Sequence, residues 1–346
     1  MSFRNSYGWL DRCLHRMAFS LPGAQLGVAD LERKLFRREL EGVAAPRPLF
    51  VTGLPRAGTT ILLELLSRTP SIATHTYRDM PFVLSPMLWG RFARRFHKAS
   101  APRERAHGDG IQISLDSPEA FEEVVWMAFH RDRYRASAIT PWDSVGDDEF
   151  LQFFRDHMRK VVALRKRDKP TAQRYASKNN LNIARLPSLL EAFGDATALV
   201  PFRDPIQHAA SLLRQHRRFS EMHTDDAFAR RYMAGIGHFD FGLNLKPVDF
   251  DGWTRGRDTA AADPEAEDGD AVGTESIDEV KGELLRLRGD TDKSAPTPGG
   301  AASSSRASLP ALVPGLPAGI LVTPEMEDLL SKLLSSASPR VGFCGM

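Results

Sequence analysis

The stretch that decides the fold is residues 49–60, which read LFVTGLPRAGTT. Its first four residues follow Pro46 and Pro48 and predict a strand, and residues 61–66 (ILLELL) predict an apolar helix. A glycine-rich turn between a strand and a helix directs backbone N–H groups to one point at the positive end of the helix dipole. The stretch therefore predicts an anion-binding loop in an α/β fold with a parallel sheet.

The loop lacks the lysine that a nucleotide hydrolase uses. The hydrolase pattern is G-x-x-x-x-G-K-[ST], in which the lysine reaches the β- and γ-phosphates. Here Gly53 and Gly58 keep the spacing, Thr59 stands at the lysine position, and the cation is Arg56, inside the loop. A donor with less charge than a triphosphate suits such a loop. The alternative is a turn that only connects the strand to the helix.

The composition is that of an ordinary globular protein, with 346 residues, 42% hydrophobic, 26% charged and a formal net charge of +2. This charge gives no indication of a nucleic-acid partner. Two cysteines, Cys13 and Cys344, provide no disulfide framework, which favours a reducing compartment. No window reaches the ~20 apolar residues of a membrane span. Residues 9–19 have an amphipathic pattern that favours packing on the core over a membrane surface, and we expect a cytoplasmic protein.

A second strand–helix unit is predicted further along the chain, with a strand over residues 195–202 and a helix over residues 206–218. Between the two units, helices are predicted over residues 118–130 and 149–167. The stretch 91–105 is rich in arginine and lysine. It is either a solvated helix face or a rim that attracts an anionic donor.

Four regions are expected. Residues 1–45 form a helical segment that packs on the core, and residues 46–253 form the main domain. Residues 254–310 are low in aromatic residues and rich in Ala, Gly, Ser, Pro, Asp and Glu, which is typical of disorder. Residues 311–346 form a tail with one possible helix at residues 324–334.

The loop PRAGTT, residues 55–60, resembles the P-R-S-G-T-T loop of bacterial sulfotransferases that use 3′-phosphoadenosine 5′-phosphosulfate (PAPS). A second signature of that family is an arginine at a strand end with a serine eight residues later, as in Arg203 and Ser211 here. The likeness spans residues 49–253. It implies a P-loop-type parallel sheet flanked by helices, with a largely disordered C-terminal region.

The resemblance also implies a donor site. Ser211 and Arg203 would hold the 3′-phosphate, since two helical turns after Pro205 bring the serine back over the strand end. The 5′-phosphosulfate would be held by the loop residues Arg56, Ala57, Gly58, Thr59 and Thr60. The expected reaction moves a sulfuryl group from PAPS to a hydroxyl of a small-molecule, glycan or lipid acceptor, without a metal.

Charge that develops in the reaction would be neutralised by Arg56 and Lys178, the lysine of the family-like segment SKNNLN. The general base has several candidates. Asp79 is the first choice, with a salt bridge to Arg78 or another arginine as its structural alternative, and His75 is a further candidate. Glu119 and Glu122 are three residues apart and are expected to share a helix face.

The region after Trp253 departs from the family pattern. Many members close the 3′-phosphate site with a basic, glycine-containing loop, for which residues 255–257 (RGR) are a weak substitute. A divergent tail or a reading-frame change would explain this. The alternatives to an active enzyme are a nucleotide-binding relative that lost its closure and, against the missing lysine, a P-loop kinase. The acceptor and the oligomeric state are left open by the sequence.

Overall fold

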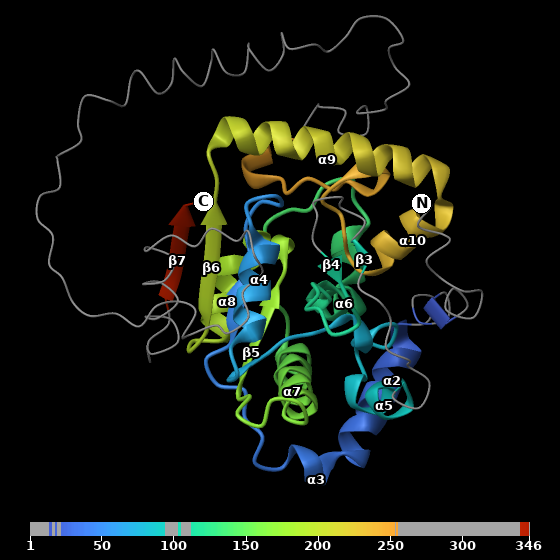
Figure 1. Cartoon of the computed structure of the whole chain (residues 1–346), viewed down its shortest axis with the longest axis vertical. Coiled ribbons are helices and arrows are strands. Elements are labelled where there is room, and N and C mark those ends of the chain that lie inside the picture. Colours follow the sequence, from blue (N-terminus) through green and yellow to red (C-terminus); the bar gives the residue numbers. More distant parts are fainter. Residues whose placement is uncertain are drawn as a thin grey trace, which may run out of the picture.

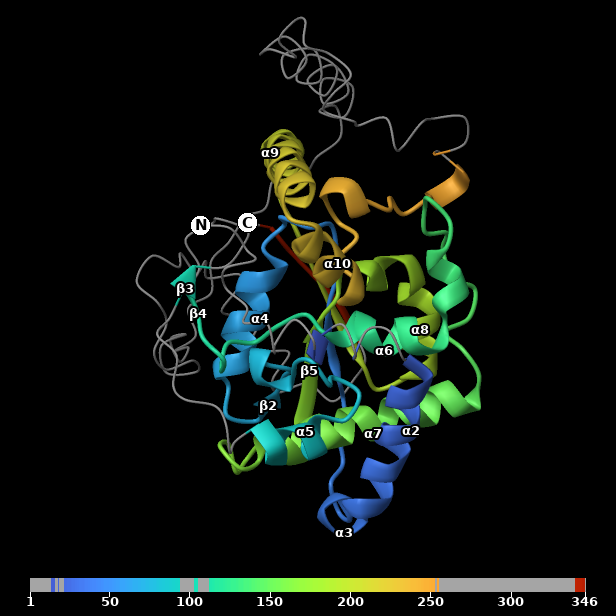
Figure 2. The same cartoon turned by 90° about the vertical axis from the view of Figure 1, so that its right-hand side faces the viewer.

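The computed structural model describes residues 14, 15, 18, 22–93, 103–104, 112–252, 254 and 340–345. In this part of the chain a parallel sheet carries helices on both faces (Figures 1 and 2). The strands are β1 (Leu49–Val51), β2 (Ile72–Ala73), β3 (Arg103–Glu104), β4 (Gln112–Ile113), β5 (Arg174–Lys178), β6 (Thr197–Phe202) and β7 (Arg340–Gly345).

The connecting elements are helical. The α-helices are α2 (Pro22–Leu35), α3 (Arg37–Leu40), α4 (Thr59–Arg68), α5 (Pro86–Ala93), α6 (Glu122–Phe129), α7 (Asp148–Arg165), α8 (Leu186–Ala192), α9 (Pro205–Asp225) and α10 (Ala227–Gly235). The 3₁₀ turns are η2 (Tyr77–Asp79), η3 (Arg131–Tyr134), η4 (Asn180–Arg185), η5 (Gly242–Asn244) and η6 (Phe250–Gly252).

Strand β1 lies in the middle of the main sheet, whose order is β2-β5-β1-β6-β7, all parallel. Every residue of β1 is buried, as expected for a parallel strand covered on both faces. Val51 pairs with Lys178 of β5 and with Leu199 of β6. The carboxyl ends of the strands therefore meet at one edge of the sheet, where ligands bind in open α/β folds.

Helices cover both faces and this carboxyl edge. Helix α4 lies on one side of the sheet and α8 on the other, and α9 runs across the strand ends (Figures 1 and 2). The side of α4 that faces the sheet consists of Leu62, Leu63, Leu65 and Leu66, all buried. The predicted α/β class with a helix-flanked parallel sheet is confirmed.

An aromatic cluster joins the sheet to α6 and α7. The Trp126 ring lies 4.6 Å from the Phe150 ring and 5.4 Å from the Phe154 ring, measured between centroids. Phe50 of β1 lies 6.3 Å from Phe154. Because aromatic side chains bury large apolar areas, this packing holds the N-terminus of α6 close to the sheet.

The predicted elements are present with shifted ends. The strand predicted at residues 195–202 is β6, and the helix predicted at residues 206–218 is α9, which continues seven residues further to Asp225. The helix predicted at residues 149–167 is α7. It begins at Asp148, where the Asp147 side chain accepts a 2.9 Å hydrogen bond from the Phe150 N–H.

Five strands, β2, β3, β4, β5 and β7, were not predicted. Strand β7 comes from the tail region 311–346 and pairs along β6 from Thr197↔Arg340 to Phe202↔Gly345. The helix predicted at residues 324–334 lies outside the described residues, as do the low-complexity region 254–310 apart from Thr254 and most of the basic stretch 91–105. The four-region division of the chain stays a prediction.

Candidate active site

The glycine loop, residues 53–60, has a backbone suited to an anion. Gly53 has φ +131° and Gly58 has φ +97°, and a Cβ on Gly53 would lie 3.4 Å from the Pro201 carbonyl oxygen. Arg56 also has a positive φ of +70°, a conformation that costs a non-glycine residue about 1–3 kcal/mol and is concentrated at ligand sites. Helix α4 starts at Thr59 without a side-chain cap. Its first-turn N–H groups have no intrahelical acceptor, and they therefore point toward the loop.

Helix α9 fixes the outer side of the glycine loop. The Arg56 Nε donates to the Ser211 Oγ at 3.3 Å, so two residues predicted to hold the donor meet from elements 155 positions apart. One turn earlier, the His208 Nε2 lies 2.7 Å from the Pro55 carbonyl oxygen. A carbonyl only accepts, so this nitrogen carries the hydrogen. Apart from its place on the same helix face, three residues before Ser211, no feature of the sequence indicated His208.

Arg203 lies just beyond the carboxyl end of β6, beside the start of α9. Its Nη2 donates to the Gln207 Oε1 at 3.3 Å. Ser211 was predicted to act together with Arg203, but the contact of its hydroxyl in the structure is with Arg56. The joint grip of Arg203 and Ser211 on a phosphate stays a prediction.

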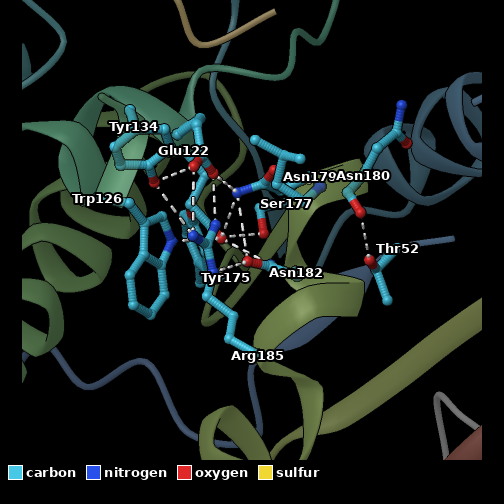
Figure 3. A network of polar contacts seen from close by, with 12 residues as sticks. Thr52, Glu122, Trp126, Tyr134, Tyr175, Ser177, Asn179, Asn180, Asn182 and Arg185 are labelled. Atoms are coloured by element: carbon cyan, nitrogen blue, oxygen red, sulfur yellow. Dashed lines mark hydrogen bonds and ion pairs between the residues drawn. The ribbon is translucent and has the colours of Figure 1, made fainter. Parts of the chain in front are cut away.

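Asn180 connects the glycine loop to the residues after α10. The Thr59 Oγ1 donates to the Asn180 Oδ1 at 3.3 Å, and the Thr52 Oγ1 donates to its backbone carbonyl at 3.2 Å (Figure 3). The Asn180 Nδ2 in turn donates to the Asp240 Oδ2 at 2.9 Å. Neither Asn180 nor Asp240 was predicted as a site residue. The position of Asn180, two residues after the end of β5, was the available signal.

Glu122 lies in a buried polar network at the start of α6 (Figure 3). Its carboxylate is 0% exposed and accepts from Ser177, from the Asn182 Nδ2 at 2.8 Å and from the Trp126 Nε1 at 3.1 Å. The adjacent Glu123 pairs with Arg185. Burial and the Glu122 charge both raise the pKa of Tyr175 well above its ordinary value. These contacts give Glu122 a role in holding α6 to the end of β5.

Asp79, on η2, and His75, two residues before η2 begins, form a second buried cluster. The Asp79 carboxylate is 2% exposed, pairs with Arg165 and lies 2.9 Å from the His75 Nδ1. Burial alone would raise the pKa of Asp79, but Arg165 and His75 hold it below the usual range of an aspartate. The salt bridge foreseen as the structural alternative is present, with Arg165 as the partner. The second nitrogen of His75, Nε2, lies 2.9 Å from the His157 Nε2.

A cavity of about 530 Å³ adjoins this second cluster. Asp79 and Arg165 line it together with Arg78, Asp116 and Lys169. Within the described part of the chain, no residue of the glycine loop lines this cavity.

Glu119 does not share a helix face with Glu122, contrary to our expectation, because α6 begins only at Glu122. The preceding residues pair with the chain after β2 instead. Pro118 bridges Thr76, and the Glu119 N–H donates to the His75 carbonyl at 3.0 Å. An extended segment satisfies these backbone groups and leaves no helical turn for Glu119.

The charges of Lys178, Asp240 and Glu119 all act on His238, which follows α10. Burial lowers the pKa of His238, and Lys178 lowers it further, whereas the charges of Asp240 and Glu119 raise it. The His238 Nε2 is 3.9 Å from the Asp240 Oδ2. Of the predicted catalytic residues, Lys178 and Glu119 thus belong to this group, together with two residues that the sequence did not single out.

The described residues contain no group of three or more His, Cys, Asp or Glu side chains arranged to hold a metal ion. None of their helices combines the length and the apolar character needed to cross a bilayer.

A model of the sulfotransferase family matches residues 48–239, more than half of the chain. Among solved structures, the sulfotransferase STF1 of Mycobacterium tuberculosis H37Rv aligns with a TM-score of 0.35 and 17% identity, over 61% of this chain and 62% of its own. The sulfotransferase STF9 of Mycobacterium avium aligns with a TM-score of 0.32 and 16% identity, over 74% and 81%. No curated protein matches.

Proposed function

Because the chain belongs to the sulfotransferase family, we propose that it transfers a sulfuryl group from PAPS to a hydroxyl of an organic acceptor. The acceptor is a small molecule, a glycan or a lipid, and the reaction uses no metal and takes place in the cytoplasm. The observation that carries the proposal is the contact between Arg56 of the glycine loop and Ser211 of α9. It joins the two segments that would hold opposite ends of the same nucleotide.

The donor site is built from backbone and side-chain donors at the carboxyl edge of the sheet. The N–H groups of Ala57 and Gly58, and the first turn of α4 with Thr59 and Thr60, suit the 5′-phosphosulfate. The positive φ of Arg56 keeps its backbone in the loop while its side chain reaches α9. Arg203 lies one strand away from the loop and, with Ser211, suits the 3′-phosphate.

Catalysis by these residues rests on alignment and charge. The acceptor oxygen must approach the sulfur in line with the bridging oxygen that leaves on the nucleotide. Negative charge grows on that bridging oxygen and on the sulfuryl oxygens. Arg56, in the loop, and Lys178, the last residue of β5, are the cations placed to stabilise it. The loop thus holds the donor and, through Arg56, stabilises the developing charge.

The predicted bases differ in how well a substrate could reach them. His75, Asp79 and Glu122 are buried and engaged with other side chains. Glu119 is partly exposed, and its charge, like that of Lys178, acts on His238, so it is the best placed of the four predicted candidates. In this proposal the buried Glu122 shapes the site, and the base is one of the carboxylates whose charge acts on His238.

Calorimetry with 3′-phosphoadenosine 5′-phosphate (PAP), with and without EDTA, tests the donor assignment. We expect PAP to bind in both conditions, and Arg203→Ala to weaken binding by at least ten-fold, because a charge-assisted contact to the 3′-phosphate is lost. Arg135→Ala is the matched control, since Arg135 is exposed and pairs only locally with Asp132. Equal affinity for PAP and ADP would contradict the assignment, and loss of binding in EDTA would favour a metal-dependent nucleotide site.

A further inference from the structure

A continuous line of polar contacts leads from the glycine loop to a carboxylate outside both predicted motifs. Thr59 contacts Asn180, and Asn180 contacts the Asp240 Oδ2. Asn180 presents one group to each neighbour, its oxygen to the Thr59 hydroxyl and its nitrogen to the carboxylate. This amide has a single orientation that satisfies both contacts, so the distance between the loop and Asp240 is fixed.

The segment that carries Asp240 has a glycine near each end, at a position where neighbouring atoms leave no room for a side chain. Gly237 has φ +77°, and a Cβ there would lie 2.6 Å from the Glu123 Cβ. Gly242 has φ +67°, and a Cβ there would lie 2.6 Å from the His223 Nδ1. Between them, the His238 ring stacks on Phe219 of α9 at 5.2 Å. The segment is thus clamped between the buried Glu122–Glu123 network and α9.

Asp240 differs from the buried acids in its accessibility. Its side chain is 13% exposed and that of His238 is 12% exposed, against 2% for Asp79. Within the described residues, both polar contacts of Asp240 use Oδ2. Its second oxygen, Oδ1, is therefore left for a hydroxyl group that enters beside the glycine loop.

We propose that Asp240 is the general base that accepts the proton of the acceptor hydroxyl. This inference rests on the proposed function. The acceptor oxygen forms a bond to the sulfur as its proton passes to the Asp240 Oδ1, and the bond from sulfur to the bridging oxygen breaks. The electron pair of that bond stays on the 5′-phosphate of PAP. The proton then leaves Asp240 to water.

Asn180 and His238 are positioning residues in this arrangement. Asn180 keeps the carboxylate at a set distance from the loop by donating to Oδ2. His238, whose pKa is lowered by burial, has its Nε2 3.9 Å from the same oxygen. Each acts through Asp240 and neither exchanges a proton with the acceptor.

The test compares PAPS and PAP binding to the full-length protein, because it needs no knowledge of the acceptor. A carboxylate within a few ångströms of the sulfuryl group repels its negative charge, so Asp240→Asn is expected to tighten PAPS relative to PAP by about five-fold. The substitution keeps the shape and the contact with Asn180. Asp225→Asn is the matched control. It removes the same charge from an exposed site fourteen residues along α9 from Ser211, a rise of about 21 Å.

A second measurement follows the release of labelled sulfate and its transfer to added alcohols and phenols. Asp240→Asn is expected to slow both by at least about 100-fold with PAP affinity unchanged. An unchanged PAPS-to-PAP ratio in Asp240→Asn would overturn the assignment while leaving the proposed function intact, and a ratio that changes only in Glu119→Gln would transfer the role to Glu119. Wild-type protein that binds neither nucleotide would overturn the proposed function itself.

Discussion

Two aspartates, Asp79 and Asp240, show how differently one side-chain type is used on the two sides of this fold. Asp79 lies on η2, buried, with the Arg165 guanidinium and the His75 ring around it. Asp240 lies before η5, partly exposed, with an uncharged amide as its hydrogen-bond donor. A full ion pair in a buried place keeps a carboxylate from accepting protons, whereas an amide contact only orients it. Neighbours and access, more than distance from the glycine loop along the chain, distinguish a structural acid from a reactive one.

The largest expected effect is on the free energy of unfolding, at the ion pair of Asp79 and Arg165. Arg165→Leu removes the cation that neutralises a buried carboxylate, and such losses cost about 3–5 kcal/mol of the free energy of unfolding. Urea unfolding of the variant measures it. The double variant Asp79→Asn with Arg165→Leu should recover part of the loss, because no buried charge is left unpaired. A single variant as stable as the wild type would contradict the structural role of this pair.

A smaller effect is expected where α9 holds the glycine loop. His208→Phe removes the hydrogen bond to the Pro55 carbonyl, which is worth about 1 kcal/mol, and PAP affinity should fall by about five-fold. His208→Gln, which can donate to the same carbonyl, should restore most of the affinity. Isothermal titration of both variants checks this. Equal losses in the two variants would show that the ring fills space and that its hydrogen bond is unimportant.

The smallest expected effect is on how the stability of the fold depends on pH. Burial, with His238, Arg230 and His216 nearby, lowers the pKa of His223 to about 4. The unfolded chain then binds more protons than the folded one between about pH 6.5 and 4, so stability should fall as the pH falls through this window. His223→Gln should flatten that slope, to which His157 and His238 also contribute. Chemical denaturation at a series of pH values measures it, and an unchanged slope would contradict a buried neutral His223.

The Asp79 side responds in a different window. Its pKa is depressed in the folded state, so the stability that it contributes is complete above its unfolded pKa of about 3.9 and is lost as the pH falls below that value. Asp79→Asn should therefore flatten the curve below about pH 4. A curve that stays as steep below pH 4 in the variant as in the wild type would contradict the lowered pKa of Asp79.

Local patterns predicted the parts of the fold that local chemistry determines. The apolar run before Gly53 and the leucines after Thr60 are sufficient for β1 and α4, and Arg203 and Ser211 marked the β6–α9 unit. Strand β2 has two residues and β5 has charged ends, so neither has a pattern that stands out. Strand β7 exists through its pairing with β6, which sequence periodicity does not contain.

Some residues of the candidate site were predicted and others were missed. Residues of the glycine loop follow each other along the chain and could be named from the motif. Asp240 is linked to the loop through Asn180, which lies sixty positions earlier in the chain. The fold of α9 and α10 brings Asp240 there. Asp79 was favoured by its distance from the loop along the chain, and nothing in the sequence indicated that Arg165, 86 positions later, would pair with it.

Sulfate transfer from labelled PAPS tests the central claim most directly. The full-length protein is incubated with labelled PAPS and a cell extract that supplies hydroxyl acceptors, beside Arg56→Ala and the exposed-site control Arg135→Ala. We expect labelled organic sulfate with the wild type and with the control, and its loss in Arg56→Ala, in which a cation beside the sulfuryl group is removed. Tight PAP binding without any acceptor-dependent product would contradict it and identify the protein as a nucleotide-binding relative without transferase activity.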